Sequence, residues 1–572
     1  MTHTSTIFLV LRRLRTPLIV LITLFAVSVL GLTLMPGPPD PNGGQMPRIS
    51  FFHAVYFISY TATTIGFGEI PYAFSEQQRL WTVVCIYMSV VGWAYTLGTV
   101  FAMLQDKNFL SALAVQRFAR QVRRLREPFF LVCGYGEAGH LICQGLDELG
   151  YRAVVIEKDE VKIGDLELQS YQADVPALCA DAGQPDTLIF AGLTSKYCRG
   201  VMALTNDDNT NLAVAIAARL LAPALPALCR AEHADTVANM ASFGTRHIIN
   251  PFEKFAEYMA LALHAPAAYN LLLWLTGLPG TTVDRHREPP RGKWVLCGYG
   301  AFGKVMTRAL ENAGLPVTII DRAAPLAPDH TWYRGDGTGA DALRAAGIDD
   351  AVGIVAATAN DVNNLSTVVT AKQLNPALFT VLRQNHVANR TLFDAFESDF
   401  TMVPAEIVAH ECLAILTTPL LSPFLDRVRA ADDAWAGALL EELTGRFGWD
   451  VPCVWSVSIN LLQSPAVYRV MMRHEARLSL SALLRAPVTD RPPLACTPLL
   501  LLREGDAPRY LPEGELEIRL GDQLLFVGTE EARRDLGMTL FNGHTLQFVL
   551  TGRDLPGGMI WEWLAQRREA RG

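Results

Sequence analysis

Charged residues are scarce in this chain, and no two cysteines have the spacing of a redox or metal motif. Only 19% of the 572 residues are Asp, Glu, Lys or Arg, and 50% are hydrophobic. The ten cysteines form no C-x-x-C pair and mostly lie in apolar runs, as buried thiols in a reducing compartment do. The composition excludes a collagen-like, disordered or disulfide-stapled protein and disfavours a zinc site.

An overall basic charge is also absent, because the net charge is −8. Residues 1–127 contain eleven Lys or Arg and five Asp or Glu, a net charge of +6, so the remaining residues carry −14. Nucleic acid is a poor partner for that acidic majority. A basic flank beside apolar segments instead suits the cytoplasmic surface of a lipid bilayer.

Two uncharged stretches are long enough to cross a membrane as helices. Pro17–Met35 has 19 residues and Leu80–Leu104 has 25, where a bilayer needs roughly 20. Arginines precede the first stretch and follow the second, which predicts that both termini are cytoplasmic in a bacterial or archaeal cell membrane. A third apolar run, Tyr258–Val283, is interrupted by prolines, and we expect it to be a buried helix of the aqueous part.

The segment between the two spans has the pattern of an ion pathway. Ser50–Ala62 is aromatic, apolar and too short to cross the membrane, as a re-entrant half-helix is. The residues after it include Thr64, Ile65, Gly66, Phe67 and Gly68. Glycines at alternate positions permit a backbone whose carbonyls all point inward, and such carbonyls can replace the water around a cation.

This sequence resembles the selectivity filter of potassium channels, which usually reads Thr-Val-Gly-Tyr-Gly. Phe67 replaces the commoner Tyr and lacks its hydroxyl, and Glu69 stands where Asp is frequent. The resemblance implies that K⁺ is the permeant ion. It also implies a homotetramer, because each chain supplies one strand of the filter.

The second span is predicted to line the inner cavity of the pore. By similarity to two-span channels, Gly92 matches the hinge position, where glycine weakens a helix. Leu97 and Phe101 would then face the pore, and four leucines around one axis can close it by expelling water. Packing of Leu97 against lipid or another helix is the alternative.

The aqueous part contains an internal duplication. Residues 129–159 match residues 294–322, and further on Asn211 matches Asn364 and Arg230 matches Arg383. Each copy reads strand, glycine turn, helix, strand and acidic residue, which is the opening of a doubly wound parallel sheet.

Each copy has a G-x-G-x-x-G turn and, 23 positions after its first glycine, an acidic residue. These residues are Gly134, Gly136, Gly139 and Glu157 in copy one, and Gly298, Gly300, Gly303 and Asp321 in copy two. The first glycine makes the turn, the second admits a pyrophosphate, and the third lets helix and strand pack closely. The acid can bind ribose hydroxyls and disfavours a 2′-phosphate, so NAD or ADP fits better than NADP.

Further candidates for nucleotide contact are Tyr135, Glu137, Ala138 and Asp181 in copy one, and Tyr299, Ala301, Phe302, Arg322, Asp336 and Arg383 in copy two. Glu137 would bring a carboxylate close to the pyrophosphate, whereas copy two has the neutral Ala301. The alternative is that the glycines serve packing alone and no nucleotide binds, and the case for this alternative is stronger in copy one.

A long apolar helix is expected after each copy, beginning at Pro251 and at Pro404. The pattern resembles RCK domains, the regulators of potassium conductance that are also called TrkA-N domains, over about residues 128–425. LEIRLGDQLLFVG (516–528) resembles their C-terminal lobe, in which a strand leads to Gly-Asp and another strand. Only residues 280–293 separate the helix of copy one from copy two, so the C-terminal lobe of copy one is expected to be missing or reduced.

The predicted fold is a two-span helical pore module, α/β Rossmann-like doubly wound parallel-sheet RCK domains and a small α+β C-terminal lobe. The expected parts are the pore (1–104), a linker helix (105–127), the first RCK N-lobe with its crossover helix (128–292), the second (293–450) and its C-terminal lobe (451–572).

These patterns predict a K⁺-selective channel whose opening is controlled by cytoplasmic nucleotides of the NAD or ADP type. No catalytic constellation accompanies the nucleotide fold, so we do not expect an enzyme. Two alternatives stay open: a membrane-anchored nucleotide or redox sensor with a vestigial pore, and a non-selective cation channel. The acidic excess also suggests that Ca²⁺ controls the channel, although no loop has the spacing of Ca²⁺ ligands.

Overall fold

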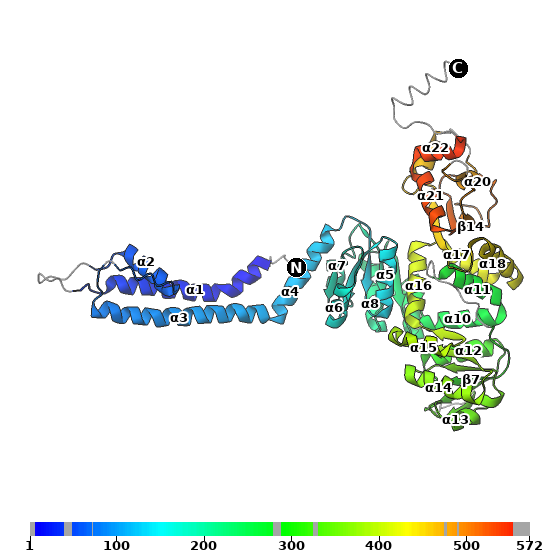
Figure 1. The fold of residues 1–572 in the computed structure, drawn as a ribbon, viewed down its shortest axis with the longest axis horizontal. Helices are drawn as coiled ribbons and strands as arrows, with labels where there is room; N and C mark the ends of the chain where they lie inside the picture. The colour runs from blue at the N-terminus through cyan, green and yellow to red at the C-terminus, as the bar shows by residue number, and fades with distance from the viewer. Residues whose placement is uncertain are drawn as a thin grey trace, which may run out of the picture. The chain divides into compact units, whose positions relative to one another are not determined.

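The computed structural model describes residues 6–38, 48–70, 72–277, 288–323, 330–473, 478–488 and 491–552. The chain divides into two compact units, residues 1–124 and residues 125–572. Each unit is described by itself, with the elements labelled as in Figure 1.

The first unit contains helices and no β-strand among its described residues. Helices α1 (Thr6–Leu34) and α3 (Glu76–Gln105) run antiparallel side by side, and the short α2 (Phe51–Ala62) packs against both (Figure 1). Helix α4 (Lys107–Arg124) follows α3 after a break at Asp106. Leu14–Leu34 and α3 are long and apolar enough to cross a membrane, in agreement with the two predicted spans.

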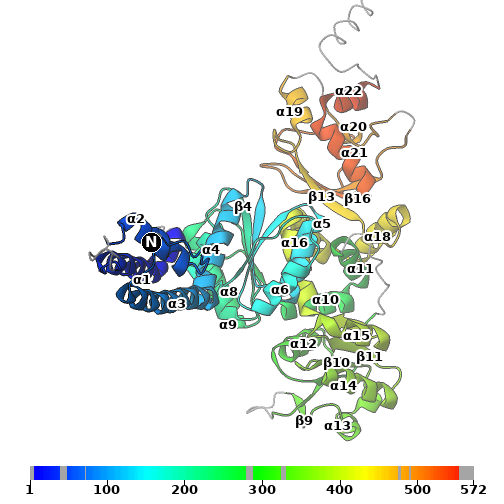
Figure 2. The same cartoon turned by 60° about the vertical axis from the view of Figure 1, so that its left-hand side comes forward.

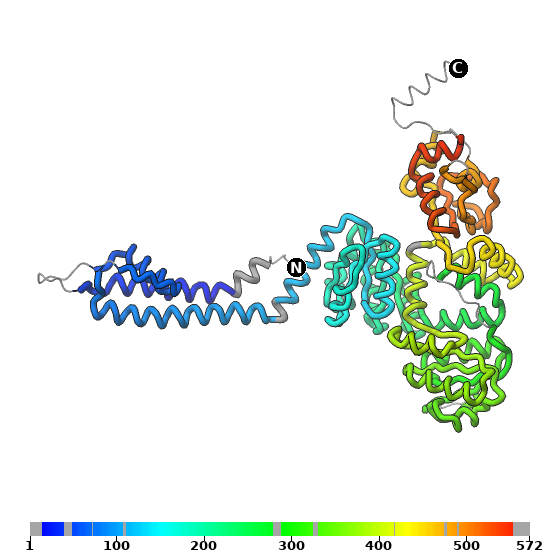
Figure 3. Tube along the Cα trace, viewed as in Figure 1, coloured from blue at the N-terminus to red at the C-terminus, as the bar shows by residue number. Residues whose placement is uncertain are grey.

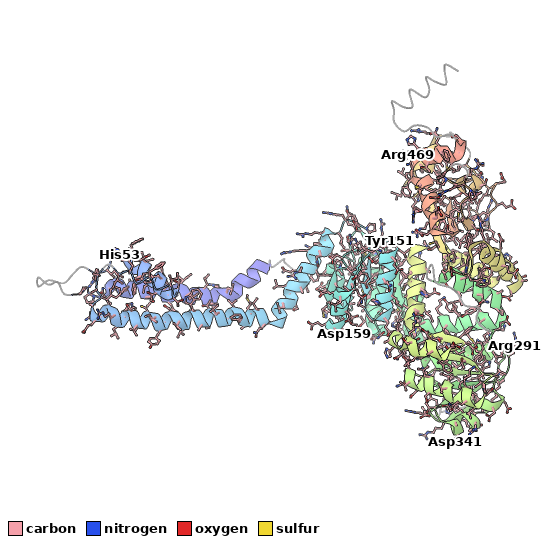
Figure 4. All side chains as sticks on the ribbon, viewed as in Figure 1. His53, Tyr151, Asp159, Arg291, Asp341 and Arg469 are labelled. Carbon is pink, nitrogen blue, oxygen red and sulfur yellow. The ribbon has the colours of Figure 1, made fainter. Side chains whose placement is uncertain are left out.

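Side-chain caps fix where these helices begin. Ser50 accepts a hydrogen bond from the backbone N–H of His53, which is labelled in Figure 4, and this starts α2. Ser75 and Gln78 form a reciprocal capping box at the start of α3. Each cap satisfies amides that have no partner within the helix. Helix α3 therefore begins four residues before the uncharged stretch.

The second unit contains two six-stranded parallel sheets with the same topology. The first has the order β3-β2-β1-β4-β5-β6 and the second β12-β11-β10-β7-β8-β9. Counted from the first strand of each copy, both follow the order of a doubly wound dinucleotide-binding fold. The duplicated sequence predicts this result.

The strands of copy one are β1 (Phe129–Cys133), β2 (Arg152–Glu157), β3 (Ala177–Cys179), β4 (Cys198–Ala203), β5 (Ala227–Arg230) and β6 (His247–Ile249). Its helices are α5 (Glu137–Glu148), α6 (Glu160–Leu168), α7 (Pro185–Phe190), α8 (Asp208–Leu221) and α9 (Ala234–Ser242). The central strand β1 is wholly buried, as expected of a parallel strand covered on both faces.

The strands of copy two are β7 (Trp294–Cys297), β8 (Val317–Asp321), β9 (Thr331–Arg334), β10 (Gly353–Ala356), β11 (Phe379–Arg383) and β12 (Phe400–Met402). Its helices are α12 (Ala301–Asn312), α13 (Ala340–Ala345), η1 (Ile348–Asp350), α14 (Asp361–Leu374), η2 (Val387–Asn389) and α15 (Arg390–Phe396). In both copies the glycine turn lies between the first strand and the first helix.

The long helix predicted after each copy is broken in the structure, so that expectation was wrong. Copy one is followed by α10 (Pro251–His264) and α11 (Pro266–Thr276), and copy two by α16 (Pro404–Thr417) and α17 (Leu421–Ala430). Pro266 and Pro419 explain the breaks, because proline disfavours helical backbone in the preceding residue. Ala265 and Thr418 accordingly have ψ angles of 74° and 66°.

Each copy is covered by a helix that follows the other copy. Helix α10 packs against α12 of copy two, and α16 packs against α5 of copy one, as the trace in Figure 3 shows. Met259, Leu271 and Trp274 are fully buried, which confirms that the described part of the apolar run beginning at Tyr258 belongs to a packed core. Residues 278–283 of that run lie outside the described residues.

The C-terminal part is an antiparallel sheet with helices around it (Figure 2). Its elements are α18 (Asp433–Phe447), β13 (Cys453–Ser458), α19 (Pro465–Met472), α20 (Leu480–Leu483), β14 (Cys496–Leu502), β15 (Arg509–Tyr510), β16 (Gln523–Gly528), α21 (Glu530–Phe541) and α22 (Gly543–Thr551). The strand predicted before Gly521 does not form, and only a single bridge joins Glu517 to Ser479. The buried Asp522 accepts the Arg519 N–H and pairs with Arg503 at 2.7 Å, which fixes a turn instead.

Candidate functional site

The filter-like segment has a backbone that alternates in the sign of φ. Thr64, Gly66 and Gly68 have φ angles of 62°, 64° and 74°, and the residues between them do not have positive φ. Left-handed backbone costs a non-glycine residue roughly 1–2 kcal/mol, so the two glycines are needed where they stand. Thr64 bears that cost, which indicates a conformation imposed by its surroundings.

The inner end of the segment is tied to the end of α2. The backbone N–H groups of Ile65 and Gly66 both donate to the carbonyl of Tyr60, at 3.0 and 3.2 Å. The outer end is tied to the same helix by side chains, because the hydroxyls of Tyr60 and Tyr56 donate to Glu69. Sequence reasoning missed both tyrosines, although their spacing of four residues places them on one face of α2.

The predicted gate residues lie on α3. Gly92 is buried against α1, and a Cβ atom there would lie 2.6 Å from Leu24 Cδ1. Helix α3 continues through Gly92, so the structure shows this glycine as a site of close helix packing. Leu97 and Phe101 are 51% and 60% exposed in the single chain. Their role in gating stays a prediction.

The glycine turns have the geometry that the motif requires. Gly134 and Gly298 have φ angles of 103° and 99°, which only glycine adopts readily. A Cβ at Gly139 would lie 2.1 Å from the Gly134 carbonyl oxygen, so helix and strand meet closely there. A Cβ at Gly136 would have Lys162 Nζ as its nearest neighbour, at 3.9 Å, which leaves the space that a phosphate would need.

The acid at the end of the second strand is held facing the turn in both copies. Glu157 Oε2 accepts the Tyr135 N–H at 2.6 Å, and Asp321 Oδ2 accepts the Tyr299 N–H at 2.6 Å. Each carboxylate oxygen has two lone pairs. Both acids therefore keep acceptor capacity for ribose hydroxyls.

A cavity of about 330 Å³ lies beside the copy-one turn. The predicted residues Gly134, Gly136, Glu157 and Asp181 line it together. Residues that the sequence analysis missed line it as well: Lys158, Lys162, Thr205, Asp207 and Thr210. The sequence did indicate the two lysines, since Lys158 directly follows Glu157 and Lys162 comes one helical turn later.

In copy two, Arg322 and Asp336 face each other across the equivalent edge, with 3.4 Å between Arg322 Nη2 and Asp336 Oδ2. Hydrogen bonds from the Thr338 side chain and backbone N–H hold the pKa of Asp336 below its ordinary value. Asp336 therefore stays ionised and offsets the charge of Arg322. Arg322 is 73% exposed, so it can turn toward a ligand at this edge.

Several predicted contact residues have side chains that point into the core instead. Ala138 and Phe302 are buried, and the Phe302 ring packs against Phe252 and Phe255. The Tyr135 hydroxyl hydrogen-bonds with His140 and Tyr171 inside copy one. The Tyr299 ring packs edge-on against Trp332 in copy two. Ala138 and Phe302 lie on the buried side of the first helix, so their side chains point away from a ligand at the turn, whereas Tyr299 is only partly buried.

The Glu137 carboxylate, which the sequence analysis expected close to the pyrophosphate, is engaged by residues of copy two. Its Oε1 accepts the backbone N–H of Val387 at 2.9 Å and lies 3.8 Å from His386 Nδ1. Both partners belong to copy two. The carboxylate is therefore held at the junction of the two copies, while its neutral counterpart Ala301 makes no such bond.

Arg383 ends β11 and directs its side chain toward Phe252 of α10. Its guanidinium carbon is 4.8 Å from the centre of the Phe252 ring, and burial lowers its pKa against the opposing charges of Glu232 and Asp361. Its counterpart Arg230 pairs with Glu232 and is not among the residues lining the copy-one cavity. Arg383 of copy two thus packs on Phe252, which belongs to the helix that follows copy one.

Two family models match this chain. The TrkA-N domain matches residues 130–251 and 294–404, and the ion channel model matches residues 18–106. The chain joins an ion-channel domain to two TrkA-N domains. All three glycines of each turn, both acids and the filter-like segment lie inside the matched ranges.

Known potassium channel proteins are among the relatives of this channel-like chain. "Probable potassium channel protein 2" of Methanocaldococcus jannaschii is 20% identical over 36% of this chain and 58% of its own length. "Voltage-gated potassium channel Kch" of Escherichia coli is 27% identical over 31% of this chain and 41% of its own length. The chain thus spans about half the length of these relatives.

Solved structures of the GsuK channel cover most of the chain. The structure of the GsuK channel bound to NAD is 17% identical, with a TM-score of 0.43, and covers 94% of this chain and 99% of its own. GsuK bound to ADP is 18% identical, with a TM-score of 0.40, over 72% of this chain and 99% of its own.

Among the described residues, no group of three or more His, Cys, Asp or Glu could hold a metal ion.

Proposed function

We propose that this chain forms a potassium-selective channel whose opening is controlled by nucleotides of the NAD or ADP type. The observation that carries the proposal is the alternating φ of Thr64, Gly66 and Gly68 at the end of a half-helix, between two helices that can span a membrane. Carbonyl-lined backbone of this kind can take the place of an ion's hydration shell.

The proposal includes a homotetramer with both termini in the cytoplasm. One chain supplies one filter strand, and it leaves Ile65 and Phe67 60% and 68% exposed, as residues covered by neighbouring copies would be. Exposed arginines on α4, and the arginines that precede the uncharged stretch of α1, support the orientation. The division into pore, linker helix, two N-lobes and a C-terminal lobe is part of this proposal.

Regulation by a nucleotide rests on the geometry of the two turns. Gly136 and Gly300 leave open space at a helix N-terminus, where a phosphate charge is favoured. Glu157 and Asp321 face that space with lone pairs for ribose hydroxyls. The same two ligand classes, NAD and ADP, are bound in the GsuK structures. Control by Ca²⁺ stays a weaker hypothesis, without a supporting cluster among the described residues.

The decisive experiment is K⁺ and Na⁺ flux through the purified protein in lipid vesicles. We expect K⁺-selective current from the wild type and none from Gly66→Ala, because alanine at a φ of 64° is strained. Gly98→Ala is the matched control, since Gly98 lies inside α3 with nothing within 4 Å of its Cβ position. Equal K⁺ and Na⁺ permeability would identify a non-selective channel.

Single-channel recording then identifies the ligand. NAD, NADH, ADP, ATP and Ca²⁺ are each applied to the side that carries the TrkA-N domains. A change of open probability with at least one nucleotide is the expected result. Hydride transfer from NADH to an acceptor, without current under any ligand, would instead favour a membrane-anchored redox sensor.

A further inference from the structure

The filter of this chain lacks one of its usual supports. Phe67 stands where a tyrosine is commoner, so the hydroxyl that would fix the outer half of the filter is missing. The strained backbone nevertheless needs a fixed frame, because Thr64 holds a positive φ without being glycine. Something else must hold the outer end.

Two hydroxyls from α2 meet the outer end of the filter. Tyr60 donates to the backbone carbonyl of Glu69 at 2.7 Å, and Tyr56 donates to Glu69 Oε2 at 3.0 Å. Tyr60 is 95% buried, with its hydroxyl satisfied by this single acceptor. A hydrogen bond to the carboxylate is charge-assisted and therefore stronger than a neutral one.

Packing of the rings fixes the direction of the two hydroxyls. The Tyr60 ring meets the Phe67 ring edge-on, with 6.0 Å between their centres, and meets the Tyr56 ring edge-on at 5.4 Å. Tyr60 also accepts the Ile65 and Gly66 N–H groups through its backbone carbonyl. One residue of the half-helix thus holds both ends of the filter strand.

We propose that Tyr60, assisted by Tyr56, is a positioning residue for ion selection, and that its hydroxyl replaces the support that Phe67 cannot give. Tyr60 fixes the Glu69 carbonyl and Tyr56 fixes the Glu69 side chain, and together they limit how far the Gly66–Gly68 carbonyls can move apart. Loss of the hydroxyl lets the strand relax, which favours an ion that needs a less rigid set of oxygens. This inference rests on the proposed function as a potassium channel.

Tyr60→Phe tests the proposal, because it removes the hydroxyl and keeps the ring and the backbone carbonyl. The Na⁺-to-K⁺ permeability ratio of the variant, taken from the reversal potential, should rise about tenfold, which corresponds to about 1.4 kcal/mol. Tyr56→Phe should raise the ratio less, since it loosens only the Glu69 side chain. Tyr87→Phe, on the exposed face of α3, is the control and should match the wild type.

A rescue separates positioning from general stability. Adding Phe67→Tyr to Tyr60→Phe returns a hydroxyl to the same ring contact, and we expect it to restore at least part of the selectivity. An unchanged permeability ratio in Tyr60→Phe would overturn the proposal, even though the wild type conducts K⁺. Absence of K⁺ current from the wild type would count against the proposed function instead.

A second measurement keeps the test independent of current. The purified wild type should melt at a higher temperature in K⁺ than in Na⁺, because K⁺ bound in the filter stabilises the folded state. Tyr60→Phe should lose most of that difference, whereas Tyr87→Phe should keep it. An equal difference in the wild type and Tyr60→Phe would overturn the proposal.

Discussion

Asn364 shows how one fully buried side chain joins three segments of copy two. Its Oδ1 accepts the Thr358 N–H and hydroxyl, and its Nδ2 donates to the carbonyls of Thr358 and Arg383. Asn211 makes the equivalent bonds to Thr205 and Arg230 in copy one. The match of these two asparagines in the sequence therefore reflects a structural requirement of the fold.

Asn364→Ala should lower the free energy of unfolding by about 2–4 kcal/mol, since buried backbone groups lose their partners. Chemical denaturation of the detergent-solubilised protein measures this change. Asn312→Ala, at an exposed helix end, is the control and should stay within about 0.5 kcal/mol of the wild type. Equal stability of the two variants would contradict the role given to Asn364.

Asp361 makes the stability of copy two depend on pH. Burial acts to raise its pKa, but hydrogen bonds from Asn385, Asn389 and the His386 N–H outweigh burial and lower it. A depressed pKa means that the stabilisation is present above the ordinary value of about 4 and is lost as pH falls through the folded value.

Melting temperatures between pH 6 and pH 3 test this expectation. The wild type should lose stability toward the acid end, and Asp361→Asn should be less stable at pH 6 and show a shallower decline. An identical slope for both proteins would show that other carboxylates cause the acid sensitivity.

Among the elements, α6 adds to the copy-one site what the glycine motif alone does not supply. Asp159, labelled in Figure 4, caps this helix by accepting the Val161 N–H. The cap places Lys162 in the first turn of α6, with its Nζ beside the open space at Gly136. A cation at that point would offset the charge of a bound diphosphate.

Lys162→Ala should weaken ADP binding to copy one about tenfold by loss of one charge-assisted contact. Calorimetry in an Asp321→Ala background, which weakens copy two, measures the copy-one site. Lys196→Ala, on a lysine outside the cavity, is the control. Undiminished ADP affinity in Lys162→Ala would mean that the phosphate lies elsewhere.

The breaks in the helices after each copy were not predicted from the sequence. The period and length of the apolar runs predicted both spans, the half-helix and the alternation of strands and helices. Pro266 and Pro419 were visible in the sequence, yet the breaks depend also on where α11 and α17 can pack. The strand predicted before Gly521 does not form because Asp522 is buried and paired with Arg503, and these two residues are 19 positions apart in the sequence.

At the scale of the whole molecule, the proposed gate gives a prediction of its own. Leu97→Asp places a charge at the constriction, and hydration of that charge should raise the open probability several-fold in single-channel recordings. Leu104→Asp, also exposed on α3, is a comparison variant one turn beyond Phe101. An unchanged or lower open probability in Leu97→Asp would remove Leu97 from the gate.

The two TrkA-N copies pack into one compact unit, because α10 covers copy two and α16 covers copy one. Glu137 adds a direct bond from the turn of copy one to Val387 of copy two. The glycine turn of copy one and the loop after β11 of copy two are therefore joined by a hydrogen bond.

Hydrophobic period and backbone sterics act locally, and they were enough to predict the two spans, the filter-like segment, the duplicated Rossmann-like sheets and the glycine and acid positions. The folded chain was needed to learn where the side chains of Glu137, Arg383, Lys162 and the two tyrosines of α2 point. Those directions depend on partners far away in the chain, and one sequence carries no record of which distant residues meet.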